Sequence, residues 1–345
     1  MGNCRMWRRE WVVKVAVIVT VLNEGPAVER LLASLAAQRR LPDEVVIVDG
    51  GSTDGTVAIL KDWTASGRLP LRVLEEPGTN ISQGRNAAIA AATGDLIATT
   101  DAGVRLEQGW LEALVAPFEK EDSDRVVVAV SGWFVADSQN VFETAMGATV
   151  LPHVREIKAE TFLPSSRSVA FRKAAWEAVG GYPGWLDYCE DLIFDFRLQD
   201  RYGPFLFVPG ARAHFRPRGS LGVFFKQYYR YARGDGKADL WRKRHALRYL
   251  TYLLAGPLLV ALALLHSPWW GLALLAGAAV YTATPYRRLW PMLVSYGPFD
   301  RLKALLLVPV IRVVGDVAKM IGYPLGLAWR WRNRRRPEVH WRRAG

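Results

Sequence analysis

The sequence has little that would indicate a secreted, disulfide-stabilised or repeat protein. Only two cysteines, Cys4 and Cys189, occur in 345 residues, too few for a disulfide framework and without metal-ligand spacing. No repeat of 20–50 residues is visible, which excludes solenoids and propellers. Because no apolar run precedes Trp11, we expect no cleavable signal peptide. A globular protein of a reducing compartment fits these absences best.

Negative charge becomes scarce after residue 200. Residues 1–200 carry 20 Lys and Arg against 28 Asp and Glu, whereas residues 201–345 carry 25 against 5. A nucleic-acid-binding protein places its basic stripe on a folded recognition domain. Here the basic residues flank apolar runs, the pattern of a cytoplasmic membrane face. We therefore expect a membrane partner and no nucleic acid.

Residues 13–240 alternate between strand and helix patterns. Apolar runs at 15–22, 44–48 and 96–100 are typical of strands buried on both faces, and residues at helical spacing lie between them. This alternation predicts an α/β domain with parallel strands and right-handed crossovers.

Three polar residues stand where these predicted strands end. They are Thr20, Asp49 and Asp101. Ligands of parallel α/β sheets bind at the carboxyl ends of the strands. We therefore expect one crevice to collect all three side chains.

Residues 241–329 form the predicted membrane-associated region. Residues 247–265 carry one charge, at their edge, and as a helix would span about 28 Å. A second apolar run covers 269–284, and basic residues flank the pair on both sides. The positive-inside rule then predicts a membrane hairpin with cytoplasmic ends. The alternative is a buried helical pair of a soluble domain.

A third apolar stretch, 302–329, carries Arg312, Asp316 and Lys319 on one helix face. A basic tail, 330–345, follows it. Both ends of the stretch therefore look cytoplasmic, which favours an amphipathic interfacial or re-entrant helix over a third span. At the other end of the chain, residues 1–12 are predicted to be a basic arm.

Four segments carry polar residues that could do chemistry, and each also has a purely structural interpretation. The loop after Asp49 could bind a ligand or simply connect strand to helix. Asp101 could hold a divalent cation or form a turn. Glu190 and Asp191 could supply a general base or complement a helix dipole. The aromatic and cationic segment 227–231 could bind a diphosphate and a sugar or lie at a membrane interface.

Taken together in order, these segments resemble the family-2 glycosyltransferases, which are inverting enzymes with a GT-A nucleotide-binding fold. The resemblance covers roughly residues 12–235, and the C-terminal hairpin resembles membrane-attached members of the family. The motifs that carry it are TVLNE (20–24), VDGGSTDGT (48–56), GRN (84–86), TTDAG (99–103), ED (190–191) and QYYRY (227–231).

The resemblance implies a role for each matching residue. Donor-binding residues would contact the nucleotide sugar, and one of them, Asp101, would also bind the metal. Catalytic residues would deprotonate the acceptor. A third group would contact the acceptor and the diphosphate. The implied donor residues are Thr20, Asn23, Glu24, Asp49, Arg85 and Asp101, the catalytic residues Asp191 and Glu190, and the third group Gln227, Arg230 and Tyr231. The implied cofactor is Mg²⁺ or Mn²⁺ at Asp101.

Three positions depart from the family pattern. Gly50 replaces a common base-contacting acid, the DxD motif is reduced to Asp101-Ala102-Gly103, and Tyr231 replaces a tryptophan. The reduced DxD leaves one carboxylate for a metal.

The expected function is inverting transfer of a sugar from a nucleotide sugar to a lipid or glycan acceptor at the cytoplasmic face of the cell membrane. The alternative is a membrane protein that binds or senses nucleotide sugar with weak catalysis. A membrane-linked oxidoreductase is disfavoured because TVLNEGPAVE (20–29) lacks the GxGxxG pattern after the first strand.

Overall fold

The fold is described from a computed structural model that covers residues 13–120 and 126–343. The predicted basic arm, 1–12, lies outside the described residues. The chain divides into two compact units. Unit 1 comprises Met1–Phe134, Ala159–Tyr182 and Phe194–Ala213, and unit 2 comprises Val135–Lys158, Pro183–Ile193 and His214–Gly345.

An eight-stranded sheet organises unit 1. Its spatial order is β3-β2-β1-β4-β7-β6-β8-β5. The strands are β1 Val15–Val21, β2 Glu44–Asp49, β3 Leu71–Glu75, β4 Leu96–Thr99, β5 Val104–Leu106, β6 Ala129–Ala136, β7 Val169–Arg172 and β8 Leu206–Phe215.

The sheet is parallel in its N-terminal part and mixed beyond it. β1 pairs in parallel with β2 and β4, and β2 pairs in parallel with β3, as the strand–helix alternation predicts. β7 runs antiparallel to both β4 and β6. The regular alternation ends after β4, so the sequence argument for parallel pairing does not extend to these strands.

Helices cover this sheet and complete its core. They are α1 Gly25–Ala36, α2 Thr56–Ser66, α3 Ile81–Ala91, α4 Trp110–Glu119, α6 Lys173–Ala178 and the larger part of α7 Glu190–Tyr202, with the short turn η2 Ala159–Thr161. Ile18 of β1, Val46 of β2, Ile89 of α3 and Phe194 of α7 are buried in one cluster. Strands buried on both faces are what continuous apolar runs produce.

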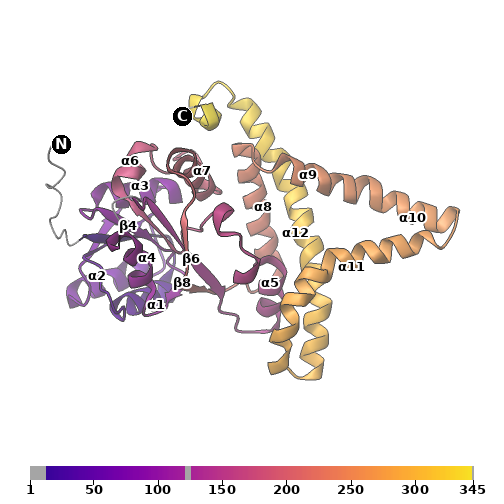
Figure 1. Cartoon of the computed structure of the whole chain (residues 1–345), viewed down its shortest axis with the longest axis horizontal. Coiled ribbons are helices and arrows are strands. Elements are labelled where there is room, and N and C mark those ends of the chain that lie inside the picture. Colours follow the sequence, from indigo (N-terminus) through magenta and orange to yellow (C-terminus); the bar gives the residue numbers. More distant parts are fainter. Residues whose placement is uncertain (1–12, 121–125, 344–345) are drawn as a thin grey trace, which may run out of the picture. The chain divides into compact units, whose positions relative to one another are not determined.

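Unit 2 consists mainly of helices (Figure 1). They are α5 Val141–Val150, η1 Val154–Glu156, α8 Leu221–Ala238, α9 Arg242–Tyr249, η3 Leu250–Ala255, α10 Gly256–Leu265, α11 Trp270–Leu289, η4 Trp290–Ser295, α12 Pro298–Arg332 and η5 Pro337–Arg343. The first turn of α7 also belongs to this unit.

Glycines let α8 and α12 lie against each other backbone to backbone. A Cβ atom at Gly322 would collide with the Tyr229 carbonyl oxygen, and one at Gly326 with that of Arg233. On the facing helix, a Cβ at Gly236 would meet the Tyr323 carbonyl oxygen. Such close approach through small residues is common where helices associate in membranes.

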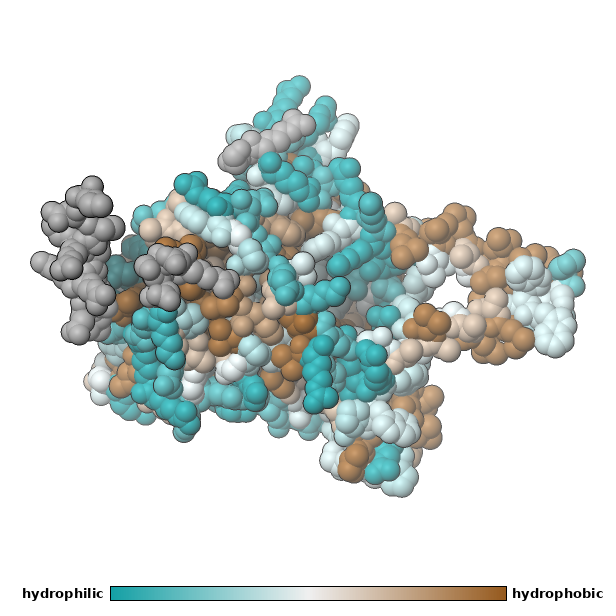
Figure 2. All heavy atoms as spheres, viewed as in Figure 1, coloured by the Kyte–Doolittle hydropathy of each residue, from teal (hydrophilic) through white to brown (hydrophobic). Residues whose placement is uncertain are grey.

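The segment Arg242–Leu265 is one continuous helical rod made of α9, η3 and α10. Among the described residues it is the one helix long and apolar enough to cross a membrane, with a mean hydropathy of 1.7 and none of its apolar window buried. One such helix is weak evidence for membrane association. Figure 2 shows hydrophobic residues over the α10–α11 hairpin.

The predicted hairpin is therefore supported only in its first helix. The second predicted run, 269–284, lies within α11, which does not meet the same length and apolarity criterion. The turn η3 is a π-helix directly before Gly256 and Pro257. Pro257 has no N–H and its ring displaces the preceding turn, which accounts for the widened geometry.

Candidate functional site

The parallel strands bring three predicted residues to one edge of the sheet. Val21 of β1 pairs with Asp49 at the end of β2, so Thr20 and Asp49 lie on neighbouring strands. On the other side of β1, Ile18 pairs with Thr99 of β4, and Asp101 follows two residues later. Because β2, β1 and β4 are adjacent, their carboxyl ends form one surface, where such sheets bind ligands.

Asp49 is buried at this edge with one carboxylate oxygen unused. Its Oδ2 accepts hydrogen bonds of 2.9 Å from the backbone N–H groups of Gly51 and Ser52. Its Oδ1 is buried and has no hydrogen-bond partner within residues 13–120 and 126–343. A buried acceptor without a donor is costly and calls for a ligand or an ordered water.

The loop after β1 is held against the loop after β2. The Oδ1 of Asn23 accepts a 2.8 Å hydrogen bond from the N–H of Thr53, and the N–H of Asn23 donates to the Ser52 hydroxyl at 2.8 Å. The N–H of Glu24 donates to the Thr56 hydroxyl at 3.0 Å. The structure thus gives Asn23 a visible role in shaping the loop around Asp49, beside its predicted contact with a donor.

Arg85 is positioned by a well-capped helix. The side chain of Asn80 caps α3 by accepting from the backbone N–H of Gln83, and the side-chain oxygen of Gln83 accepts in turn from the backbone N–H of Asn80. A Cβ at Gly84 would lie 2.9 Å from the Thr20 side chain, so glycine there lets α3 approach β1. Arg85 follows, 3% exposed, with its guanidinium 5.4 Å from the Tyr182 ring centroid.

Asp101 lies between two arginines, one of which the sequence argument missed. Nη2 of Arg85 donates to its Oδ1 at 3.0 Å, and Nε of Arg167 is 3.5 Å from its Oδ2. The hydroxyl of Thr100 donates to the Arg167 carbonyl at 3.0 Å, and that of Thr99 to the Ser166 carbonyl at 3.0 Å. These bonds fix the loop that delivers Arg167. The sequence signal that could have identified Arg167 is its position as a basic residue beside serines, just before β7.

The residues around Asp101 do not fit a preformed divalent-cation site. Both of its oxygens already face guanidinium groups, and Ala102 and Gly103 add no oxygen ligand from their side chains. A Cβ at Gly103 would lie 4.0 Å from Oε2 of Glu24. Within the described parts of the chain, no group of three or more His, Cys, Asp or Glu could hold a metal. The residues around Asp101 therefore offer the predicted Mg²⁺ or Mn²⁺ fewer free oxygen ligands than a complete DxD motif would.

The predicted catalytic pair lies in unit 2, at the first turn of α7. Glu190 is 6% exposed and Asp191 is half-buried. Cys189 precedes them at a φ of 65°, and its thiol donates to the Tyr231 carbonyl at 3.3 Å. Burial, and after it the charges of Asp235 and Asp191, raises the pKa of the Cys189 thiol well above its usual value. The thiol of Cys189 thus ties this loop to α8.

The segment Gln227–Tyr231 of α8 lies beside this loop. Nε2 of Gln227 donates to the Tyr231 hydroxyl at 2.7 Å. Nη1 of Arg230 donates to the Tyr188 hydroxyl at 2.8 Å, and its guanidinium lies 5.6 Å from the Tyr188 ring centroid. Unit 2 thus brings the acidic pair and the aromatic–cationic segment together, and unit 1 holds the predicted donor residues.

Comparisons with known proteins identify a family and a fold. A family model described as glycosyl transferase family 2 matches residues 16–178. The succinoglycan biosynthesis protein ExoA of Rhizobium meliloti (strain 1021) is 27% identical over 307 residues, which cover 84% of this chain and 90% of that protein. The pre-mycofactocin glycosyltransferase of Mycobacterium tuberculosis (strain CDC 1551 / Oshkosh) is 27% identical over 213 residues, 59% of this chain and 41% of that protein.

A solved structure shares the fold. The mannosyltransferase PcManGT from Pyrobaculum calidifontis, in complex with GDP-Man and Mn²⁺, superimposes with a TM-score of 0.59 at 22% identity, covering 89% of this chain and 87% of that one. The α/β fold with its mixed sheet and C-terminal helices is therefore a GT-A fold. Residues 16–178 therefore belong to glycosyl transferase family 2, and the protein is a glycosyltransferase.

Proposed function

We propose that this enzyme transfers a sugar from a nucleotide-sugar donor to a hydroxyl of a lipid or lipid-linked glycan, with inversion at the anomeric carbon. The observation that carries the proposal is the buried, unpartnered Oδ1 of Asp49 at the sheet edge. An N–H of the nucleobase would satisfy it. The Mn²⁺ and GDP-Man of the PcManGT structure support a nucleotide-sugar donor for this fold.

The donor diphosphate would be neutralised by arginine. Arg85 and Arg167 flank Asp101 at the carboxyl edge of β4, and guanidinium groups bind phosphate oxygens in bidentate fashion. As the glycosidic bond breaks, negative charge grows on the diphosphate, and positioned cations stabilise that charge in the transition state.

Asp191 would act as the general base. It would accept the proton of the acceptor hydroxyl while the oxygen attacks the anomeric carbon from the side opposite the leaving diphosphate. A single displacement of this kind inverts the anomeric configuration. Glu190, Arg230 and Tyr231 would position the acceptor and the departing diphosphate.

The membrane would bring the acceptor to the enzyme. The exposed, apolar helix Arg242–Leu265 and the basic residues beside it would hold the enzyme at an anionic cytoplasmic surface of the cell membrane. The α11 helix would complete a hairpin, and α12 would stay at the interface.

The test is donor binding, followed as thermal stabilisation across a panel of nucleotide sugars, with and without Mn²⁺. One nucleotide sugar should stabilise the protein, and Asp49→Asn should lower its affinity about tenfold, the loss expected for a charge-assisted hydrogen bond. Asp62→Asn, an exposed change on α2, is the matched control. If no nucleotide sugar stabilises the protein, or if both variants behave alike, the proposal fails.

Sensing without turnover, the second candidate, rests on the reduced motif at Asp101–Gly103. It predicts donor binding with no sugar release or transfer, so a transfer assay separates the two.

A further inference from the structure

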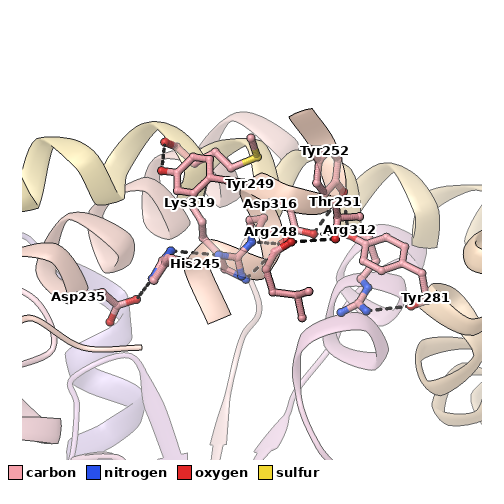
Figure 3. Close-up of polar contacts among 12 residues, drawn as sticks. Asp235, His245, Arg248, Tyr249, Thr251, Tyr252, Tyr281, Arg312, Asp316 and Lys319 are labelled. Atoms are coloured by element: carbon pink, nitrogen blue, oxygen red, sulfur yellow. Dashed lines mark hydrogen bonds and ion pairs between the residues drawn. The ribbon is translucent and has the colours of Figure 1, made fainter. Parts of the chain in front are cut away.

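A partly buried polar cluster in unit 2 is not used by the transfer reaction proposed above. We name it the helix-junction cluster. It is built from α8, α9, η3, α11 and α12, whose side chains point toward one another in Figure 3. Its members are Asp235, His245, Arg248, Tyr252, Tyr281, Arg312, Asp316 and Lys319.

Asp316 is the centre of the cluster, and both of its carboxylate oxygens already accept hydrogen bonds. Nε of Arg248 donates to its Oδ1 at 2.7 Å. The hydroxyls of Tyr281 and Tyr252 donate to its Oδ2 at 2.5 and 3.2 Å. Burial of Asp316 opposes ionisation, but these donors outweigh it and lower its pKa. The carboxylate is therefore charged and already shared among three partners.

The second carboxylate, Asp235, is also engaged. It is 3.1 Å from Nε2 of His245, whose Nδ1 faces Nη1 of Arg248 at 3.1 Å. Because arginine can only donate, Nδ1 is the acceptor and Nε2 carries the hydrogen that goes to Asp235. Arg248 is thus held by Asp316 and His245 together, and Asp235 accepts the hydrogen bond of the His245 imidazole.

Two cations of α12 remain poorly neutralised. Nε of Arg312 is buried and has no hydrogen-bond partner among the described residues, and its Nη2 donates to the Tyr281 carbonyl at 2.8 Å. Nζ of Lys319 is 3.9 Å from Asp316, with 29% of its side chain exposed. Burial, and next the charge of Arg248, lowers the pKa of Lys319 to about 8. Within the cluster, the three cations Arg248, Arg312 and Lys319 thus stand beside two carboxylates, Asp235 and Asp316, that already accept other hydrogen bonds.

An apolar groove begins beside these cations. It is formed between the η3–α10 segment and α11, and at its inner end are Thr251 and Tyr252. Tyr252 belongs to both features, because its hydroxyl contacts Asp316 and Tyr281. The remaining lining is apolar apart from backbone, and consists of Gly256, Pro257, Val260, Ala261, Leu264, Leu265 and Leu274. A cationic junction continuous with an apolar groove matches a ligand with an anionic head and a hydrocarbon chain.

We propose that this groove and the helix-junction cluster bind one lipid with an anionic phosphate headgroup, its chain along the groove and its phosphate at Arg312 and Lys319. Charge complementarity identifies the occupant: a neutral helix or a neutral lipid would leave the Nε of Arg312 without an acceptor and the cations unbalanced. The proposal concerns unit 2 alone and does not depend on the transfer reaction.

The experiment follows lipid binding to the purified full-length chain in a non-ionic detergent. The probes are phosphatidylglycerol, diacylglycerol with the same chains, and inorganic phosphate, and the readouts are thermal stability and bound lipid counted by native mass spectrometry. Phosphatidylglycerol should bind and stabilise, whereas diacylglycerol and inorganic phosphate should not. Equal stabilisation by diacylglycerol, or by inorganic phosphate, would overturn the lipid-phosphate assignment.

Variants locate the site. Arg312→Gln and Lys319→Gln should each weaken phosphatidylglycerol binding about tenfold, the loss expected for a hydrogen bond to a charged group. Lys303→Gln removes the same charge from an exposed position of α12 and should leave binding unchanged. Ala261→Phe, which fills the groove without altering a charge, should weaken binding even if Arg312→Gln does not fold. Equal loss in Lys303→Gln, or no loss in both Lys319→Gln and Ala261→Phe, would contradict the site.

Discussion

Unit 1 and unit 2 each hold a carboxylate next to arginine, but the chain assembles them differently. In unit 1, Asp101 follows a strand end, and the loop bearing Arg167 is held by threonine hydroxyls that donate to its backbone carbonyls. In unit 2, the carboxylate of Asp316 accepts hydrogen bonds from side chains of α9, η3 and α11. Parallel strands bring distant residues to one edge by topology, whereas a helix junction depends on packing. The position of Asp101 at the strand edge can be anticipated from sequence, whereas the approach of Arg167 and the contacts of the helix junction cannot.

The largest expected effect is that of Asp191→Asn. This change tests whether unit 1 binds the donor while unit 2 supplies the base for proton transfer. Asp191→Asn should lower the transfer rate by about 10²- to 10⁴-fold, the usual contribution of a general base. Donor affinity should stay within about twofold of the wild type, because the donor-binding residues lie in unit 1. Transfer of labelled sugar and donor titration measure the two quantities.

Asp200→Asn, an exposed change on the same helix, is the control for the loss of charge. Near-normal transfer by Asp191→Asn would remove Asp191 as the base.

A second test concerns the close packing that holds unit 2 together. Gly322→Leu would push a side chain into the Tyr229 carbonyl and should destabilise the protein by about 1–3 kcal/mol or more, as overpacking does. Gly271→Leu, where a Cβ meets nothing within 4 Å, should change stability much less. The two melting temperatures give the comparison, and equal values would mean that α8 and α12 do not need glycine there.

The third test asks whether arginine replaces a metal in unit 1. Arg167→Gln should weaken donor binding about tenfold, the loss of one charge-assisted contact to phosphate. Arg105→Gln, an exposed change on β5, should have little effect. Donor affinity in the wild type should be nearly the same in EDTA and in Mn²⁺.

Gly103→Asp sharpens the same comparison. It restores a second carboxylate beside Asp101 and near Glu24, and should make donor binding respond to Mn²⁺. A wild-type protein whose donor binding is abolished by EDTA would contradict the arginine account.

A fourth test uses pH in unit 2. The pKa of Lys319 is lowered to about 8, so its ammonium form is lost as the pH rises through that value. The charged and titratable groups around it are Arg248, Arg312, Asp316, Asp235 and Tyr228. Phosphatidylglycerol, whose headgroup charge is constant in this range, should bind a few-fold more weakly at pH 9 than at pH 7. The affinity of Lys319→Gln for phosphatidylglycerol should change less with pH. Identical pH profiles for the two proteins would contradict this role for Lys319.

The smallest effect concerns a half-buried carboxylate, Glu156, that binds two arginines of α11. Glu156 accepts hydrogen bonds from Arg287 and Arg288, and the bond from Arg288, opposed by partial burial, lowers its pKa to about 2. This stabilisation is complete above the ordinary pKa near 4.5 and is lost as the pH falls toward 2. Glu156→Gln should cost about 0.5–1 kcal/mol at pH 7 and less at pH 3.5, measured by thermal unfolding. Glu160→Gln is the exposed control.

The sequence predicted the parts of the molecule that follow from periodicity and strand order. The runs around Val17, Val46 and Ile97 became adjacent parallel strands, and the residues at their ends, Thr20, Asp49 and Asp101, came to one edge. Family membership was also recognisable from motifs. Asp49 and the first helical turn at Glu190 stand where their strand-end and helix-start patterns place them.

Other features could not be predicted because they depend on packing. Arg167 reaches Asp101 only through the hydrogen bonds of Thr99 and Thr100 to its loop, which no periodicity records. Arg312, Asp316 and Lys319 were seen to share a face, but sequence could not show that this face meets the tyrosines of η3 and α11. The G-x-x-x-G pattern at 322–326 was the available signal for the close contact with α8.

The most direct test is an experimental structure with a nucleotide sugar bound. The account predicts that a base N–H lies within hydrogen-bond distance of Oδ1 of Asp49 and that the diphosphate contacts Arg85 or Arg167. A donor whose base leaves Oδ1 of Asp49 unpaired, and whose diphosphate lies away from both arginines, would contradict it.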